Sequence, residues 1–207
     1  MEETLTPPPS AGMSRRGALK ALGTGLGAAT LLPLLSPQGA KAFEALQRTN
    51  AAPPLLVLTR EQHATVDAFA EAIIPADDHS PGARAARVVD YIDLLLSESS
   101  DDVKENWTKG LAALEEATRT RYSAPFVKLS PAQVEELLSD LSRNERDPQT
   151  PAEQFFRTVK DATIRGYYTS EIGIHQELRY QGNQFLAEFV GCKTEDGEEC
   201  PHCGQTP

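Results

Sequence analysis

Catalytic motifs, cysteines and aromatic residues are scarce in this sequence. Phe, Trp and Tyr make up 6% of the 207 residues, and all three cysteines lie at or after position 192. The sequence contains no Gly-x-Ser-x-Gly nucleophile elbow, no His-Glu-x-x-His zinc motif, no glycine-rich phosphate loop and no Gly-x-Gly-x-x-Gly dinucleotide fingerprint. These absences argue against a self-contained hydrolase, zinc peptidase or nucleotide-binding enzyme. We therefore expect no catalytic, cofactor-binding or metal-binding residue in this chain.

Basic residues are also outnumbered. Lys and Arg total 20 against 30 Asp and Glu, so the formal net charge is −10. Removal of a signal peptide at residues 1–42, argued below, takes away four basic and two acidic residues and leaves a charge of −12. A surface this negative repels nucleic-acid phosphates and anionic lipids. We therefore predict neither nucleic acid nor a membrane surface as a partner.

The longest apolar stretch, residues 21–35, is diluted by three glycines and a proline and is too short to hold a helix across a bilayer. It indicates the core of a signal peptide, and we predict no direct membrane span after its removal. In front of it, "SRRGALK" at 14–20 resembles the Ser-Arg-Arg-x-Phe-Leu-Lys pattern of twin-arginine export signals, with Ala18 in the Phe position. Arg15 and Arg16 are the predicted export signal, and export implies a periplasmic location.

Small residues that a signal peptidase reads follow the apolar stretch. Ala40 and Ala42 flank Lys41, so we place cleavage after Ala42 and assign residues 1–42 to a twin-arginine signal peptide. A poorly cleaved general secretory signal or a lipid-facing helix is the alternative interpretation. The export route matters because the twin-arginine pathway carries proteins that are already folded, which raises the question of what needs folding first.

The remaining chain shows helix signals and no alternating strand. Residues 43–58 include "NAAPP" and indicate a linker. Helix starts are predicted at the capping boxes of Thr59, Ser130 and Thr150, at Ser80-Pro81 and at Asp101-Asp102, and apolar residues follow each at helical spacing. A last helical or irregular piece is expected at about 174–190. The predicted fold class is all-α, a single small bundle of about five to six helices over residues 59–190, followed by a Cys-containing tail at 191–207.

Two groups of titratable residues are candidates for chemical sites. His63, Asp67 and Glu71 lie four apart on one helix side, and the sequence favours a solvated helix edge with an ion pair. Asp77-Asp78-His79 forms a polar group between two apolar helices, and a wet turn is the favoured interpretation. A stand-alone metal-dependent enzyme built on the second group stays open as an alternative.

The cysteines form a separate group. Cys200-Pro201-His202-Cys203 has the residue order of a disulfide oxidoreductase centre, but it lies four residues from the C-terminus with no strand nearby. A structural disulfide is favoured in an oxidising compartment, and the odd count leaves one thiol. We predict that this thiol is Cys192 and that it forms an intersubunit bridge. A thiol-redox protein centred on the tail is the alternative.

Three blocks of the sequence resemble one known family. The blocks are "LTREQHATVDAFAEAIIPADDHSPGARAARVVDYIDLLL" at 58–96, "FFRTVKDATIRGYYTSEIG" at 155–173 and "ELRYQGNQF…GC" at 177–192. They are similar to the gluconate 2-dehydrogenase subunit 3 family. The resemblance implies a small, non-catalytic, exported subunit of a periplasmic sugar or polyol dehydrogenase. It also implies a large FAD-dependent partner of the glucose-methanol-choline type, often a cytochrome c subunit, and membrane association through these partners.

That resemblance answers the question raised by the export signal. FAD is inserted in the cytoplasm and held by a folded domain, so a flavoprotein must cross the membrane assembled. The folded cargo is then the partner, which this chain stabilises and escorts. Tyr167, Tyr168 and Tyr180 cluster in a Gly- and Asn-rich setting, as interface tyrosines do, and are the predicted partner interface. The alternative is that they close the end of the bundle.

Overall fold

Helices are the regular secondary structure in the part of the chain that the structure describes. The structure is a computed structural model, and it describes residues 35–49, 51–180 and 182. No strand occurs among these residues, which confirms the predicted all-α class. The helices are α2 (Pro37–Gln47), α3 (Arg60–Ile73), α4 (Val88–Ser97), α5 (Asp101–Tyr122), α6 (Pro131–Ser142) and α7 (Pro151–Tyr168), with a 3-10 turn η1 (Phe126–Lys128) and a π-helical turn η2 (Gly173–Glu177).

The three predicted capping boxes begin α3, α6 and α7. In each, the cap hydroxyl accepts a bond from the backbone N–H three residues on, and the side chain at that position bonds back to the cap's N–H. At α3, for example, Thr59 Oγ1 accepts from the Gln62 N–H at 3.2 Å, and the Thr59 N–H donates to Gln62 Oε1 at 2.9 Å. These local bonds satisfy N–H groups that have no partner within the helix.

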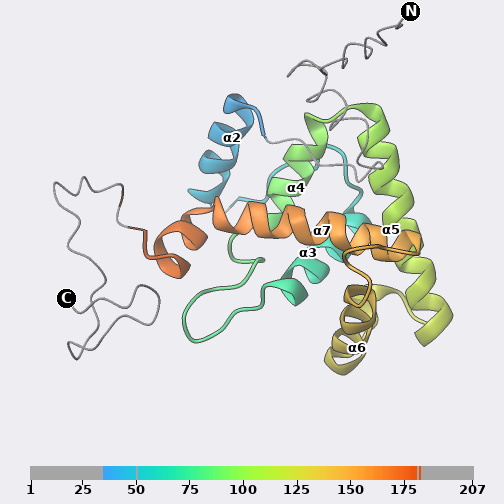
Figure 1. The fold of residues 1–207 in the computed structure, drawn as a ribbon. Helices are drawn as coiled ribbons and strands as arrows, with labels where there is room; N and C mark the ends of the chain where they lie inside the picture. Colours follow the sequence, from blue (N-terminus) through green and yellow to red (C-terminus); the bar gives the residue numbers. More distant parts are fainter. Residues whose placement is uncertain (1–34, 50, 181, 183–207) are drawn as a thin grey trace, which may run out of the picture.

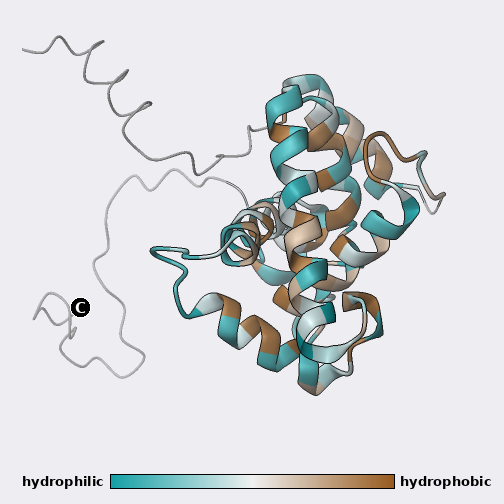
Figure 2. Cartoon of the chain, turned by 90° about the vertical axis from the view of Figure 1, so that its right-hand side faces the viewer, coloured by the Kyte–Doolittle hydropathy of each residue, from teal (hydrophilic) through white to brown (hydrophobic). Residues whose placement is uncertain are grey.

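Helix α7 is the element around which the others pack. It contacts α3, α4, α5 and α6, and it crosses the middle of the bundle in Figure 1. Figure 2 shows hydrophobic and hydrophilic residues alternating around the helices, and most of the buried residues are apolar. In the interior, Phe69 lies 5.0 Å from Phe126 and 6.1 Å from Phe156 between ring centroids. Each such buried side chain stabilises the fold by roughly 1.5–3 kcal/mol.

The predicted helix start at Ser80-Pro81 is wrong. The next helix, α4, begins at Val88, after Arg87 in a left-handed conformation with φ of 57°. Ser80 and Pro81 lie in the preceding loop, where both bond to the Tyr167 hydroxyl from α7. A contact with a residue 86 or 87 positions later therefore overrides the local start signal.

Residues 43–58 differ from the predicted linker. The segment begins inside α2, whose Phe43 is buried and packs edge-to-face on Tyr91 with 5.1 Å between ring centroids. Beyond α2, the backbone at 56–58 is bound to a buried carboxylate described below. Most of the predicted linker is thus part of the folded domain.

Candidate partner interface

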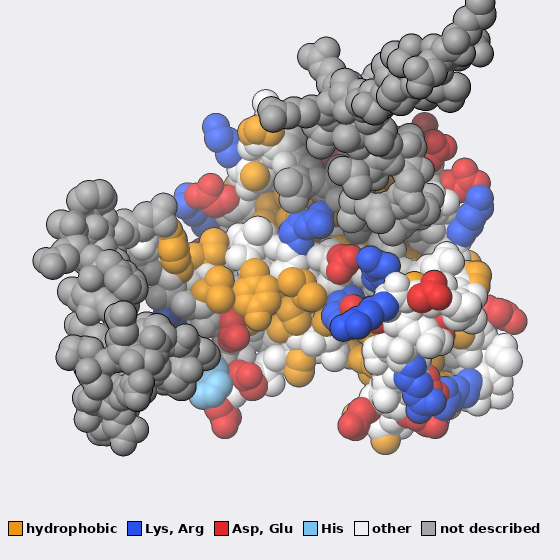
Figure 3. All heavy atoms as spheres, viewed as in Figure 1, with side chains coloured by type: hydrophobic (Ala, Val, Ile, Leu, Met, Phe, Trp, Pro, Cys, Tyr) orange, Lys and Arg blue, Asp and Glu red, His pale blue; other side chains and the backbone are white. Residues whose placement is uncertain are grey.

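Large apolar side chains that remain exposed are few, and they fall mainly in two places. Among the residues that the structure describes, Leu55, Leu56 and Val57 precede α3, and Ile164, Tyr168, Leu178 and Tyr180 lie in α7 or just after it; Val127 of η1 is the other exposed large apolar side chain in this described part. Figure 3 shows hydrophobic side chains gathered near the C-terminal half of α7. Single exposed apolar residues are ordinary, whereas a group of them indicates an interaction site.

The α7 surface, defined here as Ile164 and Tyr168, is created by helical spacing. The two residues are four apart and so share one side of α7, with exposed fractions of 39% and 38%. The Tyr168 ring packs edge-on against the buried Tyr167 ring, with 5.3 Å between centroids and 90° between planes. An exposed ring fixed in this way loses little side-chain freedom when a partner covers it.

Tyr167 does not belong to that surface, which corrects the prediction that grouped it with Tyr168 and Tyr180. Its side chain is only 1% exposed. Its hydroxyl donates to the Pro81 carbonyl at 2.7 Å and lies 2.6 Å from Ser80 Oγ, so the Ser80 hydroxyl donates to it. Burial raises the pKa of the Tyr167 hydroxyl. Tyr167 therefore ties α7 to the loop before α4, which is the bundle-closing role named as the alternative.

Tyr168 and Tyr180 are exposed, as an interface requires. Tyr180 is 50% exposed, and its backbone N–H donates to the Ile174 carbonyl at 3.0 Å. Leu178, 56% exposed, lies between them in sequence after η2. The interface role of the two tyrosines stays a prediction.

The other exposed apolar group, Leu55 to Val57, is held in place by Asp93, a residue that the sequence pattern did not point to. Asp93 of α4 is 4% exposed, and its carboxylate accepts the backbone N–H groups of Leu56, Val57 and Leu58 at 2.7, 2.9 and 2.8 Å. We call residues 55–58 the strap. An acidic residue in a strongly apolar helix was the available signal, because carboxylates are rarely buried without partners.

The first titratable group lies along one edge of α3, as predicted, but its ion pairs run to α4 and to the segment before it rather than along α3. His63 Nε2 lies 3.3 Å from Asp90 Oδ1, and Arg84 Nε donates to Asp67 Oδ2 at 2.7 Å. The Arg84 backbone N–H also donates to Glu71 Oε2 at 2.7 Å. The bond to Asp67 raises the pKa of the Arg84 guanidinium. These side chains join α3 to the segment that leads into α4.

The second titratable group is a turn, also as predicted. Asp77 Oδ1 accepts the backbone N–H groups of His79 and Ser80 at 2.8 and 2.9 Å, and these bonds lower the pKa of the Asp77 carboxyl. Across residues 35–49, 51–180 and 182, no three His, Cys, Asp or Glu side chains are grouped as a metal site would require. No helix in these same ranges has the length and hydrophobicity to span a membrane.

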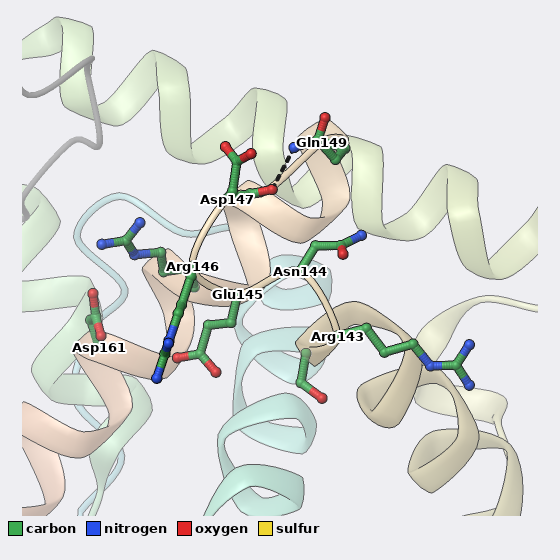
Figure 4. Close-up of a pocket in the computed structure, with 9 residues that line it drawn as sticks. Arg143, Asn144, Glu145, Arg146, Asp147, Gln149 and Asp161 are labelled. Carbon is green, nitrogen blue, oxygen red and sulfur yellow. Dashed lines mark hydrogen bonds between the residues drawn. The ribbon is translucent and has the colours of Figure 1, made fainter.

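A polar hollow of about 780 Å³ lies between the α6–α7 connection and α7. It is lined by Ser142, Arg143, Asn144, Glu145, Arg146, Asp147, Gln149, Arg157 and Asp161. In Figure 4 the Arg143 side chain extends away from Glu145 and Asp161. Lys160 Nζ donates to Glu145 at 2.7 Å. Charges of both signs and an open, polar lining are typical of a solvated connection between helices.

Of the other predicted site residues, some lie in the part of the chain that the structure describes and some lie outside it. Ala40 and Ala42 are exposed on α2. Arg15 and Arg16, and also Cys192, Cys200 and Cys203, lie outside the residues that the structure describes. Their predicted roles in export and in disulfide or intersubunit bonding stay predictions.

Comparison with known proteins identifies a family for most of the described chain. Residues 60–185 match the family model described as Gluconate 2-dehydrogenase subunit 3. Neither the curated proteins nor the solved structures contain a significant match. The matched range begins at α3 and extends past η2, so it includes Asp93 and the α7 surface.

Proposed function

The chain belongs to the gluconate 2-dehydrogenase subunit 3 family, and from that membership we propose that it is the non-catalytic small subunit of a periplasmic FAD-dependent sugar or polyol dehydrogenase. Its partner is a large flavoprotein of the glucose-methanol-choline type, with a cytochrome c subunit as a further partner. The family match over more than half of the chain carries this proposal. The Rossmann-type domain that holds FAD is built on parallel strands, and residues 35–49 and 51–180 contain none, so we assign the flavin to the partner.

The second part of the proposal concerns export. The Arg15-Arg16 pair addresses the chain to the twin-arginine route, which accepts folded cargo. A small subunit that binds the flavoprotein in the cytoplasm lets both chains cross together with FAD already in place. In this way one signal peptide serves two polypeptides.

Replacement of Arg15 and Arg16 by lysine should leave nearly all of the large subunit in the cytoplasm, because the export machinery reads the arginine pair and the escorted large subunit depends on it. The measurement is an immunoblot of both subunits in periplasmic and cytoplasmic fractions of cells that express them together. Lys20→Arg, which keeps the charge and the arginine pair, is the matched control and should export both. A large subunit that reaches the periplasm beside the twin-lysine chain would contradict the escort role.

The α7 surface is the part of the described chain that we assign to binding the large subunit. Ile164 offers apolar area, and Tyr168 offers a rigid ring with a polar hydroxyl at its tip, the combination that is common at interface hot spots. When a partner covers these side chains, each Å² of apolar surface removed from water contributes roughly 25 cal/mol to the free energy of binding. Leu178 and Tyr180 extend the same assignment beyond α7.

Changing Ile164 and Tyr168 together to serine should weaken binding of the large subunit by at least about tenfold, which corresponds to roughly 1.4 kcal/mol. Both side chains are substantially exposed, so the helical circular dichroism and thermal unfolding should stay close to those of the unchanged chain. Binding is measured by titrating the purified subunit against the large subunit. Val127→Ser, which changes an exposed apolar residue on η1, is the control and should bind normally. Unchanged affinity of the double variant would remove the α7 surface from the proposal.

A further inference from the structure

The predicted processing site lies in the middle of a docked helix. Cleavage after Ala42 would cut the bond between Ala42 and Phe43, and α2 runs from Pro37 to Gln47 on both sides of it. Figure 1 shows α2 at one end of the bundle beside α4, and these two helices are in contact. Whether a peptidase can cut this bond therefore depends on how firmly each half of α2 is attached to the rest of the fold.

The half before the bond is attached through Glu98, the residue that follows α4. The Ser36 N–H donates to Glu98 Oε2 at 2.8 Å, and the Ser36 hydroxyl donates to Glu98 Oε1 at 2.6 Å. The same hydroxyl oxygen accepts the Gly39 N–H at 3.0 Å and so caps α2. Gly39 is buried, and a Cβ there would lie 2.6 Å from a Glu98 carboxylate oxygen. The bonds from Ser36 lower the pKa of the Glu98 carboxyl.

The half after the bond is attached through three other residues. Phe43 is 4% exposed and packs on Tyr91. The Arg87 guanidinium donates to the carbonyls of Leu46, Thr49 and Ala51, the last at 3.0 Å. The Gln47 side-chain carbonyl accepts the Glu171 N–H at 2.9 Å. Anchors on both sides hold the Ala42–Phe43 bond in helical form.

A peptidase binds the bond that it cuts in an extended segment of chain, so a helical bond must first open. When opening and closing are fast relative to cutting, the cleavage rate follows the population of the open form. Every contact that docks α2 lowers that population. The exposure of Ala40 and Ala42 does not change this, because exposure of a side chain does not extend the backbone.

We propose that the folded subunit retains residues 36–42, because docking of α2 keeps the bond after Ala42 closed to signal peptidase. The C-terminal part of the predicted signal peptide, residues 36–42, is then a structural part of the subunit and is not removed. This inference rests on the export role proposed above, since without a signal peptide there is no site to protect. It replaces cleavage after Ala42, the prediction from the sequence, with retention of that segment.

The test compares cleavage of the same bond in two settings. Purified full chain and a synthetic peptide of residues 30–46 are each incubated with signal peptidase in detergent, and mass spectrometry follows the appearance of the new N-terminus at Phe43. We expect the peptide to be cut after Ala42 and the folded chain to be cut at least about tenfold more slowly. Glu98→Ala should speed cleavage of the folded chain several-fold, because it removes both bonds to Ser36.

Glu44→Ala is the matched control. Glu44 is a glutamate of α2 whose exposed side chain pairs with Arg48, and its loss should leave the cleavage rate unchanged. Equal rates for folded chain and peptide would overturn the proposal, as would no effect of Glu98→Ala or a peptide that is not cut after Ala42. The test uses neither the large subunit nor export. A failure of co-export in cells would therefore count against the escort role alone.

Discussion

Asp93→Ala is expected to lower the free energy of unfolding by about 3 kcal/mol. The change removes a carboxylate that accepts three backbone N–H groups of the strap. The bond to Leu58 is buried, so its N–H would lose its partner without gaining water, and bonds to a charged acceptor contribute more than neutral ones. Urea unfolding followed by circular dichroism measures the change.

The control for Asp93 is Asp102→Ala. Asp102 is also an aspartate in a helix, but it is exposed in the first turn of α5. Its loss should cost only about 0.3–1 kcal/mol through the helix dipole. Equal effects of the two substitutions would mean that the strap is held by its own apolar contacts and that the buried carboxylate contributes little.

Gly173→Ala is expected to destabilise the chain by about 2–3 kcal/mol and to release the turn η2 from the end of α7. A Cβ at residue 173 would lie 2.0 Å from the Tyr167 carbonyl oxygen. The oxygen is a backbone atom and the Cβ is bonded directly to the backbone, so neither can rotate aside. The turn would have to move, which breaks the bond from the Gly173 N–H to Ser170 Oγ at 2.9 Å. Thermal unfolding and hydrogen exchange of the amides at 173–178 measure the two parts of this result.

Gly166→Ala, in α7, provides the comparison for Gly173. A Cβ at Gly166 would lie 2.8 Å from a Tyr91 ring carbon, and a side chain can shift where a carbonyl cannot. Alanine also gains up to about 1 kcal/mol of helix propensity over glycine. Gly166→Ala should therefore cost clearly less than Gly173→Ala. A larger loss of stability for Gly166→Ala than for Gly173→Ala would show that close packing of η2 against the end of α7 is not what requires glycine at 173.

Features with a local cause were predictable from the sequence. The caps at Thr59, Ser130 and Thr150 depend on residues within three positions, and all three begin helices where expected. The apolar residues that follow the predicted helix starts at helical spacing include Ile92 of α4 and Val159 of α7, and both are buried. Local patterns carry this information because capping and amphipathicity are properties of a single helix.

Features with a distant cause were missed. Ser36 begins α2 with the help of a glutamate 62 positions later, and Ser80 fails to begin a helix because Tyr167 holds it in a loop. Tyr167 and Tyr168 are adjacent letters with opposite environments, which only the position of α7 in the bundle decides. For the candidate interface, the sequence pattern grouped the three tyrosines together and did not separate the buried one from the exposed ones.

Trp107 can serve as an intrinsic fluorescence probe of the folded state of this subunit. Trp107 is the only tryptophan in the 207 residues, is 3% exposed, and packs edge-to-face on Phe155 with 5.2 Å between ring centroids. It lies in α5, and its indole N–H has no hydrogen-bond partner in the part of the chain described. Its fluorescence should be blue-shifted in the native state and move to the red on unfolding. Changes to α2 or to the exposed face of α7 that leave this emission unaltered have spared the α5–α7 contact.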